Sequence, residues 1–90
     1  MADIHVEEAG QGQYTVEVVE GSSRSQHTVT VTAEEQARFG PDSTPEALVR
    51  ESFVFLLERE PKEAILGRFS LSTIQRYFGS YGTDIVKRLS

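Results

Sequence analysis

Residues 13–20 read QYTVEVVE, and the architecture of the protein follows from this pattern. Tyr14, Val16 and Val18 alternate with residues that are mostly polar. A spacing of two is the spacing of a β-strand, in which successive side chains point to opposite faces of the sheet. The stretch therefore predicts a strand with one buried face and one largely solvated face.

The same alternation occurs on both sides of this strand. Residues 3–8 and 26–32 also alternate between apolar and polar side chains. The connecting residues 10–12 and 21–25 are rich in glycine and serine, which favour tight turns. We expect a three-stranded antiparallel β-meander with strands at about 3–8, 13–20 and 26–32. Because so short a meander is only marginally stable in water, one of its faces must be covered.

The second half of the chain predicts the helices that cover this face. Residues 45–60 should form the longest helix, because Pro45 follows a run of capping side chains and apolar residues recur at helical spacing. Thr32 and Glu35 form a capping-box pattern, which predicts a short helix at 33–39. Further short helices are predicted near residues 61–66, 71–78 and 84–89. The expected fold is a single α+β domain over residues 1–90.

Composition excludes several classes of chemistry. The 90 residues contain no cysteine and two histidines, so disulfide frameworks, cysteine-ligated metals and cysteine nucleophiles are ruled out. No apolar run approaches the length that spans a bilayer, and we expect a soluble, cytoplasmic protein. The net charge of −5 argues against general attraction to nucleic acids or anionic membranes. The charge is unevenly divided, because residues 1–60 carry −8 and residues 61–90 carry +3.

The two histidines are the main candidates for metal or proton-transfer chemistry, because the acidic pairs of the sequence are better explained as solvated charges and helix starts. His5 and His27 lie on the first and third predicted strands, and pairing of the meander would bring them near each other as a paired-histidine site. A catalytic metal usually needs three protein ligands, however, and no third ligand is evident. The sequence also lacks a Gly-x-Ser-x-Gly nucleophile motif and a phosphate-binding loop. We therefore expect no catalytic residue, metal or cofactor, and a protein that is not an enzyme.

Residues 62–78 have the layout of a helix-turn-helix, with a turn at Gly67. In the second predicted helix, four polar side chains would face the major groove of DNA. These side chains are Ser72, Thr73, Gln75 and Arg76. Against this interpretation, the glycine comes one position early and the five basic residues of the C-terminal third form a sparse phosphate-binding surface. A DNA-binding regulator is therefore the alternative hypothesis.

Aromatic residues are concentrated in the second half of the chain, and a domain of this size need not bury all of them. We assign Phe53, Phe69 and Phe78 to the core. Phe55, Tyr77 and Tyr81 are the candidates for contact with a partner. The main hypothesis is a small non-catalytic module for protein–protein interaction or self-association, with a protein partner or a homodimer.

Residues 51–66, ESFVFLLEREPKEAIL, continued by apolar residues up to Phe78, are similar to a family of short uncharacterised bacterial proteins. The similarity spans Glu51–Phe78 and implies no activity and no functional residue. The order of a small sheet followed by helices also resembles HicB-type antitoxins, which join a toxin-binding sheet domain to a DNA-binding segment. That resemblance implies an antitoxin-like role for the DNA-binding alternative, although the acidic, glycine-rich sheet sequence of those antitoxins is absent.

Overall fold

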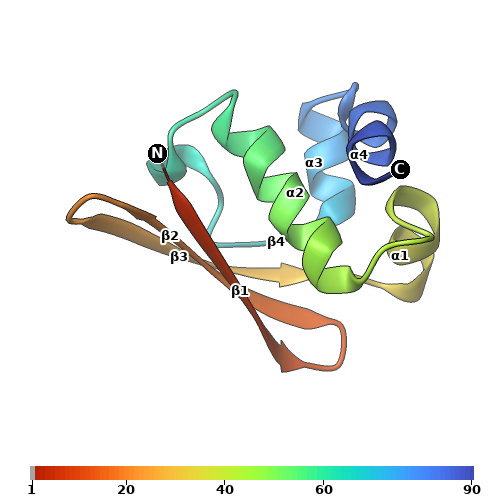
Figure 1. Ribbon diagram of the computed structural model, residues 1–90, viewed down its shortest axis with the longest axis horizontal. Helices are drawn as coiled ribbons and strands as arrows, with labels where there is room; N and C mark the ends of the chain where they lie inside the picture. Colours follow the sequence, from red (N-terminus) through yellow and green to blue (C-terminus); the bar gives the residue numbers. More distant parts are fainter. Residues whose placement is uncertain (1) are drawn as a thin grey trace.

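The three N-terminal strands form a continuous antiparallel meander in the computed structural model, which describes residues 2–90 (Figure 1). Strand β1 spans Asp3–Gly10, β2 spans Gln13–Glu20 and β3 spans Ser23–Thr30. Val16 lies at the centre, paired with Val6 on one side and His27 on the other. The predicted meander is therefore present. Strand β3 begins three residues earlier than expected, because backbone pairing with β2 extends through polar residues that carry no alternation signal.

A fourth strand, which the sequence analysis missed, completes the sheet. Strand β4 spans Arg68–Ser70 and pairs in parallel with β3, placing Phe69 beside Val29. The strand order is β1-β2-β3-β4, so the sheet is mixed and not purely antiparallel. Three residues with one apolar side chain are too short to show periodicity, and their partner strand is about forty residues earlier in the chain.

The helices lie close to their predicted positions, but several differ from the predictions in length. Helix α1 spans Ala33–Phe39, and the side chains of Thr32 and Glu35 form the capping box. Helix α2 spans Pro45–Leu57, three residues shorter than predicted, because residues 58–60 form a turn. Its start is capped by Thr44, whose hydroxyl accepts a hydrogen bond from the Ala47 amide.

The C-terminal third departs further from the prediction. The segment expected as a helix at 61–66 is a single 3₁₀ turn, η1, at Lys62–Ala64. Helix α3 spans Leu71–Tyr77, and α4 spans Tyr81–Leu89, starting three residues before the predicted 84. Lys62 in η1 is buried and pairs with Glu20 at 3.4 Å, which ties this turn to the end of β2.

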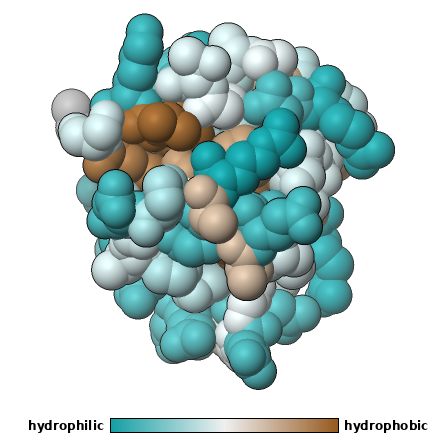
Figure 2. All heavy atoms as spheres, turned by 90° about the vertical axis from the view of Figure 1, so that its right-hand side faces the viewer, coloured by the Kyte–Doolittle hydropathy of each residue, from teal (hydrophilic) through white to brown (hydrophobic). Residues whose placement is uncertain are grey.

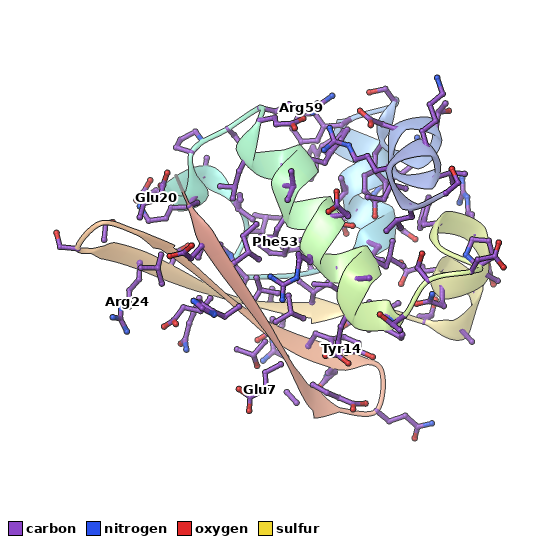
Figure 3. All side chains as sticks on the ribbon, in the orientation of Figure 1. Glu7, Tyr14, Glu20, Arg24, Phe53 and Arg59 are labelled. Carbon is purple, nitrogen blue, oxygen red and sulfur yellow. The ribbon has the colours of Figure 1, made fainter. Side chains whose placement is uncertain are left out.

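All helices lie on one side of the sheet (Figure 1), and the core lies between the two layers. Helix α2 is buried on more than one side, as expected. The Phe53 ring faces the sheet, 5.2 Å from the His27 ring, whereas the Phe55 ring contacts Tyr81 at 5.3 Å. Figure 3 shows Phe53 between α2 and the sheet, with Arg24 and Glu7 directed away from the helices. Within residues 2–90, no helix is long and apolar enough to cross a membrane.

Candidate functional site

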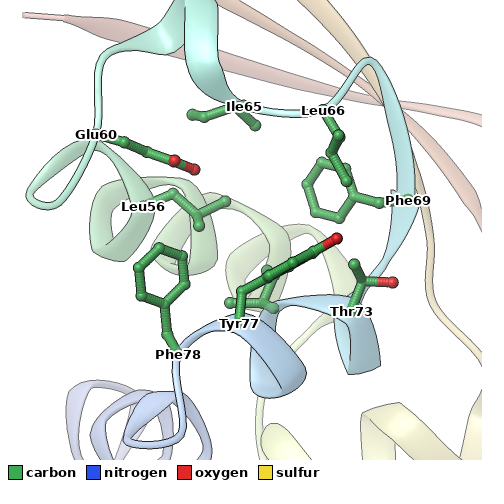
Figure 4. A pocket seen from close by; sticks show the side chains of 9 residues that line it. Leu56, Glu60, Ile65, Leu66, Phe69, Thr73, Tyr77 and Phe78 are labelled. Atoms are coloured by element: carbon green, nitrogen blue, oxygen red, sulfur yellow. The ribbon is translucent and has the colours of Figure 1, made fainter.

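A small apolar hollow opens where the C-terminal end of α2, the segment before β4 and α3 meet (Figure 4). Its apolar walls are Leu56, Ile65, Leu66, Phe69, Ile74 and Phe78, with Tyr77 beside them. Two polar residues, Glu60 and Thr73, also border it. We call this site the Tyr77 hollow. Figure 4 shows Glu60 on one side and Leu66 and Phe69 on the other, with Tyr77 between them.

The rim of the Tyr77 hollow carries two strongly exposed apolar side chains. Leu66 is 49% exposed and Tyr77 is 72% exposed. Among residues 2–90, the third large hydrophobic side chain with comparable exposure is Val86 on α4, at 41%. Val86 borders other depressions, beside α1 and outside the Tyr77 hollow. The face with α1 and α4 is mostly hydrophilic, with one restricted hydrophobic area (Figure 2).

Leu66 is held in place by a buried histidine of the sheet. The His27 ring is 3% exposed, and its Nδ1 atom lies 2.8 Å from the Leu66 carbonyl oxygen. Its Nε2 atom lies 2.8 Å from the Ser25 hydroxyl. If Nδ1 carries the proton and donates it to the Leu66 carbonyl, Nε2 accepts a hydrogen bond from Ser25. The amide of Thr28 also donates to the Gly67 carbonyl at 2.8 Å, so the segment before β4 is attached to β3 at two points.

Helix α3, which carries Tyr77, is fixed at both ends. At its start, the Glu35 carboxylate accepts hydrogen bonds from the Ser72 amide and hydroxyl. Near its end, the Gln75 side chain donates to the Gly79 carbonyl and accepts from the Gly82 amide, both at 2.7 Å. The position of Tyr77 therefore depends on α1 and α4 as well as on its own helix.

Two of the three predicted contact residues are corrected by their burial. Phe55 and Tyr81 are both 0% exposed, so neither can contact a partner in this fold. The Tyr81 hydroxyl lies 2.7 Å from the Ser52 hydroxyl, and burial raises the pKa of Tyr81 well above its ordinary value. The guanidinium of Arg59 covers the Phe55 ring at 3.6 Å. Tyr77 is the one predicted contact residue that lies on the surface.

The helix-turn-helix predicted at 62–78 is not formed, because β4 lies between η1 and α3. Ser72 and Gln75 use their polar groups to fix α3, as described above. Thr73 is half-buried at the Tyr77 hollow, with its hydroxyl 3.3 Å from that of Ser70. Of the four proposed DNA contacts, Arg76 alone has an exposed side chain that forms no hydrogen bond or ion pair within residues 2–90.

The two histidines do not meet. His5 is exposed on the uncovered face of the sheet, whereas His27 is buried on the opposite face, toward α2. The hypothesis of a paired-histidine site is therefore wrong. Within the described part of the chain, no group of three potential metal ligands comes together.

Leu66 and Glu60 also border the Tyr77 hollow and were not predicted as site residues from the sequence. The available sequence signal for Leu66 was an apolar residue directly before Gly67, outside any amphipathic pattern.

Comparisons with protein-family models, with curated proteins and with solved structures found no match. The site is therefore interpreted from its own geometry.

Proposed function

We propose that the protein is a non-catalytic binding module, and that the Tyr77 hollow receives an apolar side chain of a protein partner. The observation that carries this proposal is the pair of exposed apolar side chains, Leu66 and Tyr77, at the rim of an apolar hollow. Exposed apolar surface gathered at one place is typical of interaction sites, whereas isolated exposed apolar residues are not.

The size of the hollow supports a protein contact over a small-molecule site. Its volume is about 30 Å³, far below the roughly 300–1,000 Å³ typical of ligand pockets. A space of this size accommodates the end of one side chain. The remaining contact area would come from the flanking surface, as in protein interfaces that surround a central anchor residue.

The rigid support of both rim residues also favours this proposal. Leu66 is held through His27, and α3 is held through Glu35 and Gln75. A site whose backbone is already fixed loses less conformational entropy when a partner binds.

The test is selection of peptides from a displayed random library with the wild-type protein as bait, after depletion on the Tyr77→Ser variant. Selected peptides should share an aromatic or large aliphatic anchor. Either Leu66→Ser or Tyr77→Ser should weaken their affinity by about tenfold, because each removes apolar contact worth about 1–2 kcal/mol.

Val86→Ser is the matched control, since it removes an exposed apolar side chain outside the Tyr77 hollow. It should leave peptide affinity unchanged within about twofold. Circular dichroism should show all three variants folded, because the replaced side chains are strongly exposed. Failure to select peptides, or peptides that bind wild type and Tyr77→Ser equally, would contradict the proposal.

A further inference from the structure

Resting on the proposed function, we infer that the partner is a second copy of this chain. In the dimer, the end of the Tyr77 side chain of each copy inserts into the Tyr77 hollow of the other. Around each hollow, Arg76 of one copy pairs with Glu60 of the second copy, and the reverse pair forms on the other side of a two-fold axis.

The apolar part of the surface is complementary to itself. Tyr77, at 72% exposure, is the most exposed large hydrophobic side chain among residues 2–90, and it stands beside the hollow. A projecting ring and a receiving hollow therefore occupy one surface. In a two-fold dimer the same patch is used by both subunits, so each projection meets a cavity and none is left without a partner.

The charges of this surface support the same arrangement. Glu60 is half-buried at the edge of the hollow, and Arg76 is the exposed residue that precedes Tyr77. Within residues 2–90, the side chain of neither residue forms a hydrogen bond or an ion pair. In contrast, the acidic and basic side chains at the junction of α2 and α4 are paired with one another: Glu58, Arg59, Asp84 and Arg88.

Two opposite charges that lack partners within one copy can pair between copies. The two-fold arrangement forms the Glu60–Arg76 pair twice. The Glu60 carboxylate at the apolar rim is therefore paired with an opposite charge when the interface covers it. A heterologous partner would need to supply both a base and an acid at matching positions, whereas a second copy already has them.

The experiment is sedimentation velocity over a range of protein concentrations. Wild type should be in monomer–dimer equilibrium with a Kd in the micromolar range, about 10–100 μM, because the apolar anchor is small. Tyr77→Ser should raise the Kd about tenfold or more. Val86→Ser should leave it unchanged within about twofold.

Charge reversal tests the pairing itself. Glu60→Arg and Arg76→Glu should each weaken the homodimer about tenfold, since each places like charges together twice. The double variant should recover wild-type affinity within about threefold. An equimolar mixture of the two single variants should form a heterodimer more tightly than either forms a homodimer. Arg68→Glu is the control, because Arg68 is exposed and pairs in register with Thr28, on the uncovered face of the sheet.

A wild-type protein that stays monomeric at every concentration would overturn the inference. A dimer whose Kd is unaffected by Tyr77→Ser would do the same. So would charge reversals that weaken the dimer singly while the double variant fails to recover wild-type affinity. If selected peptides still bind the Tyr77 hollow of a monomeric protein, the binding module stands and the second copy is excluded. If the inference holds, those peptides should compete with dimerisation.

Discussion

The carboxylate of Glu35, in the first turn of α1, accepts hydrogen bonds from the amide of Ser72 at 2.8 Å and from its hydroxyl at 2.6 Å, in the first turn of α3. Its other oxygen accepts from the Thr32 amide at 2.9 Å, which completes the capping box of α1. One side chain therefore satisfies backbone donors at the starts of two helices. Through this contact, the local capping signal of α1 also sets the position of the helix that carries Tyr77.

Replacing Glu35 by glutamine should destabilise the protein in a pH-dependent way. Burial raises the pKa of the Glu35 carboxyl, but the hydrogen bonds from Ser72 and Thr32 outweigh it and hold the pKa below its ordinary value of 4.5. A lowered folded-state pKa stabilises the protein above pH 4.5, and this stability is lost as the pH falls through the folded pKa.

At pH 7, Glu35→Gln should lower the free energy of unfolding by about 1–3 kcal/mol, measured by urea denaturation. The difference from wild type should shrink as the pH is lowered below 4.5. Glu34→Gln, at an exposed carboxylate in the same turn, should show little effect. Parallel pH profiles for wild type and Glu35→Gln would contradict the role assigned to the ionised carboxylate.

The buried hydroxyl pair of Ser52 and Tyr81 should be asymmetric in its contribution to stability. The Ser52 hydroxyl donates to the Leu48 carbonyl at 2.7 Å, so the Tyr81 hydroxyl must donate to Ser52. Ser52→Ala leaves a fully buried hydroxyl donor without an acceptor and should cost about 1–3 kcal/mol. Tyr81→Phe removes that donor and should cost less, about 0.5–1.5 kcal/mol.

Thermal and urea denaturation of both single variants and the double variant would measure this difference. The double variant should be less destabilised than the sum of the two single variants, because removing both hydroxyls leaves neither unsatisfied. Additive losses, or a larger loss for Tyr81→Phe, would show that the two hydroxyls do not act as a pair.

The turn between β1 and β2 should require glycine at position 12 but not at position 10. Gly12 has a φ of +72°, and a Cβ atom there would lie 3.0 Å from the Val31 carbonyl oxygen. Gly12→Ala should therefore lower the free energy of unfolding by about 1–2 kcal/mol. For Gly10, the nearest atom to an added Cβ is the end of the Gln13 side chain at 3.7 Å, so Gly10→Ala should stay within about 0.5 kcal/mol of wild type. If chemical denaturation gives equal losses of unfolding free energy for Gly12→Ala and Gly10→Ala, this distinction is refuted.

The bond between His27 and the Leu66 carbonyl should protect the segment before β4. His27→Leu leaves this carbonyl without its partner, and the neighbouring bond from the Thr28 amide to Gly67 should open more often. Hydrogen exchange of the Thr28 amide should then accelerate about tenfold. Ser25→Ala removes the other partner of the ring and should change this rate by less than about twofold. Similar rates in both variants would exclude a specific role for the Leu66 contact.

The elements predicted correctly are those whose signals are local. The alternation around Val16 predicted β2, and the capping box at Thr32 predicted α1 with its observed bounds. Helix α2 was placed correctly at its start, where Thr44 and Pro45 act within one turn. Its end was overestimated, because the turn at residues 58–60 interrupts an otherwise helical composition.

The missed features depend on residues distant in the chain. Strand β4 exists because β3 offers it a free edge, and three residues carry no periodicity of their own. The same holds for the three predicted contact residues. Phe55, Tyr77 and Tyr81 are all aromatic and lie within 27 residues of the chain, yet of the three only Tyr77 is exposed. Composition cannot rank them, because their burial depends on how α2 and α4 pack together.

Local patterns thus specified the meander, the starts of α1 and α2, and the apolar face that the helices cover, since hydrogen bonding and side-chain periodicity within a few residues suffice for these. Tertiary packing alone decided which side chains line the Tyr77 hollow. It buried Phe55 and Tyr81 between α2 and α4, separated His5 from His27 across the sheet, and brought Glu60, Leu66 and Tyr77 to one hollow. The physical reason is that burial and proximity depend on how the helices pack on the sheet and on one another, and only the side chains left at the edges of this packing are available for contact.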